Sequence, residues 1–71
     1  MRSDNIDKIH SLTFTRTDGD SDLLTLDGYP RITVRWHDGS WVGLVDGRPV
    51  IRTAWAQLSA YRAAQKIGAL K

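Results

Sequence analysis

The sequence predicts one α+β domain, in which a mostly antiparallel β-meander of four or five strands is covered on one face by a single C-terminal helix. Two Asp-Gly pairs, Asp38-Gly39 and Asp46-Gly47, each separate short runs of β-branched or aromatic residues. Such pairs are the strongest short hairpin signal, because a type I′ turn needs positive φ at both central residues. The Ala-rich stretch 54–67 contains no Pro and is followed by Gly68, which indicates a helix. A chain of 71 residues is long enough for one domain only.

The N-terminal part is expected to supply a frayed end and two strands. Residues 1–8 are polar apart from Ile6, and we expect them to be frayed. Residues 9–16 are interpreted as a strand, since Leu12 and Phe14 alternate with Ser and Thr in the period-2 pattern of a half-buried strand. Residues 17–22 are expected to form a loop, and residues 23–27 a short second strand.

The predicted loop carries alternating carboxylates, Asp18-Gly19-Asp20-Ser21-Asp22, as a calcium-binding EF-hand loop does at its start. The pattern then fails, because Leu23 stands where the obligatory Gly belongs and Tyr29 where the bidentate Glu belongs. We therefore interpret this segment as a solvated hairpin loop without a metal.

The central hairpin is expected to pair residues 31–37 with residues 40–45. A two-residue turn places Trp36 opposite Trp41 as a cross-strand aromatic pair, and it places Ile32 opposite Val45. Gly43, opposite Val34, leaves room for a close approach. The same register puts Val42 and Leu44 on the opposite face together with Arg35, so both faces of the sheet carry apolar groups.

Residues 48–52 are predicted to form a fifth strand, which Pro49 restricts to a sheet edge. Thr53 is a candidate N-cap for the helix. A helical wheel places an apolar set towards the sheet: Ala56, Leu58, Ala60, Tyr61, Ala64 and Ile67. It places Ser59, Arg62, Lys66 and Trp55 on the opposite side. Trp55 then has two explanations: it folds over the sheet edge near Arg52, or it is exposed as an anchor for a partner.

Several function classes are not expected. There is no Cys, which excludes disulfides and thiolate metal sites and fits a cytoplasmic location. No apolar run approaches the roughly 20 residues that span a bilayer, so no membrane partner is expected. His37 and Ser40 flank a turn as a Ser-His pair would, but no orienting third group accompanies them, so we predict no enzyme. His10 and His37 lack a third metal ligand, and no cofactor or small-molecule substrate is indicated.

Charge is unevenly distributed along the chain. Residues 1–27 carry three basic residues against six Asp, a net charge of −3, and residues 28–71 carry seven against two, a net charge of +5. A basic C-terminal part suggests an acidic partner, either nucleic acid or an acidic protein surface, although a mixed soluble surface gives the same asymmetry. For nucleic acid the candidate residues are Arg31, Arg35, Arg48, Arg52, Arg62 and Lys66, with bases stacking on tryptophans. The alternative is that the tryptophans belong to the core and the arginines cover its rim.

The leading hypothesis is a non-enzymatic protein-interaction module that acts as a homodimer or on a protein partner. Two partly apolar sheet faces with one helix to cover them motivate it, because an exposed apolar face is usually an interface. The candidate partner-binding residues are Trp36, Trp41, Trp55, Arg35 and Arg52.

The stretch from Tyr29 to Leu70 resembles the small antitoxin domain of the HicB family. The corresponding pieces are Tyr29-Pro30 at a strand start, the turn Asp38-Gly39, Trp41-Val42 in the second strand, Asp46-Gly47-Arg48-Pro49, and the Thr53-led, Ala-rich helix. The resemblance implies three strands followed by a helix, and an antitoxin-like protein that acts on a protein partner; a mobile-element-encoded protein is the alternative form of the same hypothesis.

Overall fold

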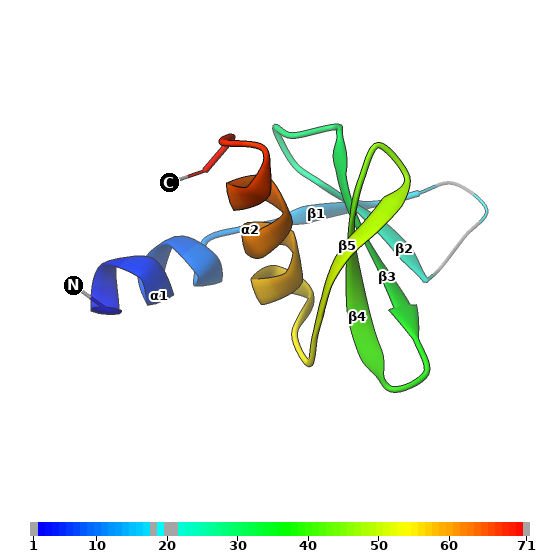
Figure 1. The fold of residues 1–71 in the computed structure, drawn as a ribbon, viewed down its shortest axis with the longest axis horizontal. Coiled ribbons are helices and arrows are strands. Elements are labelled where there is room, and N and C mark those ends of the chain that lie inside the picture. Colours follow the sequence, from blue (N-terminus) through cyan, green and yellow to red (C-terminus); the bar gives the residue numbers. More distant parts are fainter. Residues whose placement is uncertain (1, 18, 20–21, 71) are drawn as a thin grey trace.

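Five antiparallel strands form one sheet in the order in which they follow each other along the chain (Figure 1). The computed structural model describes residues 2–17, 19 and 22–70. The elements are α1 (Arg2–His10), β1 (Phe14–Arg16), β2 (Leu23–Leu26), β3 (Ile32–His37), β4 (Ser40–Val45), β5 (Arg48–Thr53) and α2 (Ala56–Lys66). The predicted α+β meander with one C-terminal helix packed against it is confirmed.

Both Asp-Gly pairs form the predicted turns. The φ angles are 53° and 81° at Asp38 and Gly39, and 53° and 84° at Asp46 and Gly47, so each turn has positive φ at both central residues. The register is also confirmed: Trp36 pairs with Trp41, Val34 with Gly43 and Ile32 with Val45.

Helix α2 lies on one side of the sheet (Figure 1) and packs against β3, β4 and β5. The core between them contains Leu26, Ile32 and Val34 from the strands and three alanines of α2, all essentially without exposed surface: Ala60, Ala63 and Ala64. A Cβ atom added at Gly43 would lie 2.6 Å from the main-chain oxygen of Ser59 and 2.7 Å from Cγ2 of Ile51. The space at Gly43 is therefore filled by the backbone of α2, and small residues permit this close approach.

The N-terminal segment differs from the expectation of a frayed end followed by a strand from Ile9. Residues 2–10 form α1 instead, and β1 begins only at Phe14. Ile9 is 9% exposed, and the side-chain amide of Gln57 on α2 donates to the carbonyl oxygens of His10 (3.2 Å) and Leu12 (3.0 Å). A nine-residue polar helix is marginal alone, so contacts with α2 account for its presence.

The start of α2 also differs from the prediction. The helix begins at Ala56 rather than Ala54, and the N-cap position is Trp55, which makes no side-chain capping bond. Thr53 is therefore not the N-cap. The wheel was wrong for Ser59 as well, because this residue is completely buried. A larger side chain would not fit where α2 meets Gly43, and the Ser59 hydroxyl finds hydrogen-bond partners there.

The end of α2 follows the sequence signal. Gly68 has φ of 74°, its N–H donates to the carbonyl of Gln65 (3.0 Å), and the N–H of Ala69 donates to the carbonyl of Ala64 (2.9 Å). These two bonds form a Schellman motif with Gly68 at the C′ position, as predicted.

Strand β5 is an edge strand, as Pro49 predicted. Its pairing with β4 shifts between Gly43, which faces Ile51, and Leu44, which faces Pro49. Val50 is the extra residue of this bulge, and both Val50 and Ile51 pack against the core cluster.

Candidate interaction surfaces

Trp36 and Trp41 pair beside the β3–β4 turn, Trp55 lies in the connection from β5 to α2, and we call these three residues the aromatic end. The rings of Trp36 and Trp41 meet on the helix-covered face with centroids 5.4 Å apart and an interplanar angle of 60°. Trp41 also pairs with Thr53, two residues before Trp55. Trp36 is 43% exposed and Trp55 is 57% exposed, whereas Trp41 is half-buried against the core.

A hydrogen-bond network fixes the backbone of the aromatic end. The hydroxyl of Ser59 donates to the carbonyl oxygen of Trp41 (2.8 Å), and it lies 2.6 Å from the hydroxyl of Thr53. The main-chain N–H of Trp55 donates to that Thr53 hydroxyl (3.1 Å). The network joins β4, the end of β5 and the first turn of α2, so the positions from which Trp41 and Trp55 project are held in place.

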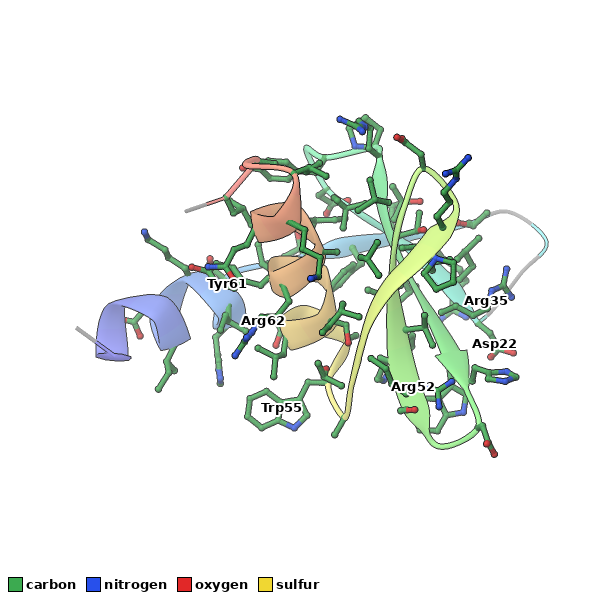
Figure 2. The ribbon with its side chains drawn as sticks, in the orientation of Figure 1. Asp22, Arg35, Arg52, Trp55, Tyr61 and Arg62 are labelled. Carbon is green, nitrogen blue, oxygen red and sulfur yellow. The ribbon has the colours of Figure 1, made fainter. Side chains whose placement is uncertain are left out.

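The side chain of Trp55 points away from the sheet, well apart from Arg52 (Figure 2). Its ring meets the ring of His10 edge-on, with centroids 6.2 Å apart and an interplanar angle of 87°. The structure thus gives Trp55 an exposed position beside α1 rather than a packed position over the sheet edge.

Arg35 and Arg52 lie on the opposite face of the sheet from Trp36 and Trp41. Val42 pairs with Arg35 on one side and with Arg52 on the other, so the two arginines share one cross-strand row. Arg35 pairs with Leu23, the residue that follows Asp22, and the labelled Arg35 and Asp22 lie on the same side of Figure 2. Four of the five candidate partner-binding residues therefore lie at one end of the sheet, Trp36 and Trp41 on one face and Arg35 and Arg52 on the other, while Trp55 projects away from the sheet.

No described helix covers the face that carries Arg35 and Arg52 (Figure 1). Half-buried Leu23, Thr25, Thr33, Val42 and Leu44 form much of it. At its β1 border the hydroxyls of Thr13 and Thr15 each donate to the carboxylate of Asp27 at 2.6 Å. These hydrogen bonds lower the pKa of Asp27 below its usual value.

The remaining cations of the nucleic-acid set are distributed over three parts of the molecule. Arg31 binds Asp46 in a bidentate ion pair, with Nε 3.0 Å from Oδ1 and Nη2 2.7 Å from Oδ2. The hydrogen bonds raise the pKa of Arg31 and lower the pKa of Asp46. Arg48 is exposed at the start of β5, and Arg62 and Lys66 are exposed on α2.

The structure also places the Ser40–His37 pair and the candidate metal ligands. The hydroxyl of Ser40 donates to the main-chain oxygen of His37 (3.4 Å) rather than to its imidazole. Among the described residues no group of three His, Cys, Asp or Glu side chains is placed to hold a metal ion. Residues 18, 20 and 21 of the carboxylate-rich loop lie outside the described residues.

Comparison of this chain with protein-family models, with curated proteins and with solved structures gave no match. Within the part of the chain that the structure describes, no helix is both long and apolar enough to cross a membrane.

Sequence reasoning did not find the Ser59 network, the bonds from Gln57 to α1, or the Arg31–Asp46 pair. A signal for the last was present, because the predicted pairing of Ile32 with Val45 makes their neighbours Arg31 and Asp46 adjacent. The Ser59 network and the Gln57 bonds join elements that are distant in the sequence, and no local sequence pattern predicts that these elements come into contact.

Proposed function

We propose that this chain is a small non-enzymatic protein-interaction module that associates with a second copy or a protein partner through the aromatic end. Arg35 and Arg52 supply charge at its rim. The proposal includes a cytoplasmic location, which the absence of cysteine supports.

The observation that carries the proposal is the exposure of Trp36 and Trp55 on a fixed backbone. The Ser59 hydrogen bonds hold Trp41 and Trp55, and strand pairing with Trp41 holds Trp36. Tryptophan is enriched among the residues that dominate binding energy at protein interfaces. An anchor on a fixed backbone loses less conformational entropy on binding than one on a flexible segment. Two such anchors at one end of a small domain therefore suit a protein partner.

The proposal is tested with Trp36→Ala and Trp55→Ala, beside Ile6→Ala as a control that removes another exposed apolar side chain, 52% exposed on α1. Association is measured by sedimentation equilibrium over a wide concentration range and by co-purification. Loss of an interface anchor should weaken association about 30-fold, with the melting temperature nearly unchanged. A wild-type chain that remains monomeric and captures no protein would contradict the proposal, as would unchanged association of both Trp variants.

An antitoxin-like role is one form of this proposal. Supporting it are the resemblance to the HicB family and the order β3, β4, β5, α2 within residues 29–70. Co-expression with candidate toxin proteins and recovery of a stable complex tests it. If the Trp36→Ala and Trp55→Ala variants form this complex as well as the wild type does, the antitoxin-like role does not depend on the aromatic end.

A second candidate function is nucleic-acid binding. The exposed cations Arg48, Arg52, Arg62 and Lys66 favour it. Its weakness is that Arg35 and Arg52 lie on the face opposite Trp36 and Trp41, so phosphate contacts and base stacking would not share one surface. Binding of a labelled oligonucleotide should weaken with rising salt along a clear log–log slope, and no binding at low salt would exclude this function.

A further inference from the structure

An open hollow between α2 and β5 is lined by Ile51, Arg62, Gln65 and Lys66. Arg62 and Lys66 are four residues apart on α2, so their side chains lie on one side of the helix. Ile51 of β5 contributes a half-buried apolar surface. The hollow thus offers two cations, an amide and an apolar side chain.

The two elements that form this hollow carry positive charge only. β5 and α2 contain Arg48, Arg52, Arg62 and Lys66, and neither contains an acidic residue. Arg62 and Lys66 have no ion-pair partner among the described residues. A ligand that brings carboxylates would therefore meet uncompensated cations.

The edge of β5 adds backbone hydrogen-bonding groups. β5 is the last strand of the sheet, and every second residue of an edge strand directs its N–H and C=O away from its neighbour. Pro49 and the bulge at Val50 interrupt this edge near its start. The uninterrupted part, residues 51–53, begins at the residue that lines the hollow. An extended segment lying there can pair with the edge for a short distance.

We infer that this hollow binds a short, extended, acidic segment of a partner protein. Carboxylates of the segment meet Arg62 and Lys66, and an apolar side chain contacts Ile51. A nucleic acid suits the hollow less well, because single strands are held by base stacking on exposed rings. The lining contains no aromatic residue, and Tyr61, the aromatic residue within α2, is 3% exposed. This inference concerns a separate surface and stands whether or not the aromatic end binds a partner.

The test uses the full chain and a fluorescent decapeptide of Glu residues with two Leu, beside the same peptide with Gln in place of Glu. We expect the Glu peptide to bind, the Gln peptide to bind at least about tenfold more weakly, and the affinity for the Glu peptide to fall as salt rises. The double variant Arg62→Glu with Lys66→Glu should reduce binding at least about tenfold. The control Lys8→Glu with Arg48→Glu makes the same change in net charge outside the hollow and should change binding less than about threefold.

Arg62→Gln with Lys66→Gln gives a milder variant, so that the test remains informative if charge reversal impairs folding. Amide chemical-shift changes should centre on Ile51, Arg62, Gln65 and Lys66. Equal binding of the Glu peptide by the wild type and the Gln variant would overturn the inference. Changes centred on Trp36 and Trp55 would assign the peptide to the aromatic end, and tighter binding of an oligonucleotide at the hollow would assign the site to nucleic acid; either result overturns the inference.

Discussion

The two faces of this sheet are built from the same strands but obey different constraints. On the covered face, Ile32 and Val34 have no exposed surface, and Gly43 meets the backbone of α2. On the uncovered face, the alternate residues Thr33, Val42 and Leu44 are only half-buried. The difference shows that close packing of α2 limits the side-chain volume on the covered face, whereas no described helix limits it on the other. Substitutions should therefore act very differently on the two faces.

The largest effect is expected for Gly43→Val. Its Cβ alone would lie 2.6 Å from the main-chain oxygen of Ser59, so α2 must move away from the sheet. We expect a loss of about 3 kcal/mol in the free energy of unfolding, measured by urea denaturation. Thr33→Val changes the uncovered face of the neighbouring strand and should alter stability by less than about 0.5 kcal/mol. Equal effects of the two variants would contradict the comparison of the faces.

Ser59→Ala tests the polar contact within the covered face. The change removes the part-buried hydroxyl donor to the carbonyl of Trp41 and one of the hydrogen-bond partners of the Thr53 hydroxyl. We expect a loss of about 1–2 kcal/mol in the free energy of unfolding. Ser40→Ala removes a longer hydroxyl bond (3.4 Å) at the rim of the uncovered face and should cost little. A neutral Ser59→Ala variant would show that the network does not stabilise the fold.

Gln57→Ala tests how α2 holds α1, the helix that does not cover the sheet. The variant loses the two bonds to the main-chain oxygens of His10 and Leu12, which lie at the end of α1 and just beyond it. We expect a loss of about 1 kcal/mol and faster amide hydrogen exchange within Arg2–His10, while exchange in α2 stays slow. Unchanged exchange in α1 would mean that the burial of Ile9 alone maintains the helix.

The smallest effect is expected from the Arg31–Asp46 pair, whose side chains are 58% and 54% exposed. The hydrogen bonds from Arg31 lower the pKa of Asp46 in the folded chain below its usual value of 3.8. The pair therefore stabilises the fold above the ordinary carboxyl range, and its contribution is lost as pH falls through the lowered pKa. In the Asp46→Asn variant the melting temperature should change slightly less with pH between about pH 2 and pH 6 than it does in the wild type. Identical pH profiles would show that the pair makes no measurable contribution.

The sequence by itself determined the central part of the fold. The Asp-Gly turns, the Trp36–Trp41 register, the edge position of β5 and the Gly68 end of α2 depend on residues close together in the chain. Backbone φ preferences and period-2 alternation operate over a few residues, so a local pattern is enough to specify these features. The same pattern assigned Arg35 to the face opposite Trp36, whereas the face that α2 covers and the place of Arg52 were given by the structure.

The tertiary structure alone decided the existence of α1, the burial of Ser59 and the exposed position of Trp55. Gln57 reaches α1 across 45 and 47 residues of sequence, and Ser59 meets Trp41 across 18. A helical wheel treats a helix as isolated, and it cannot show that α2 approaches Gly43 with its backbone. These features depend on which surfaces meet after folding, and close packing between distant elements, rather than local preference, sets that outcome.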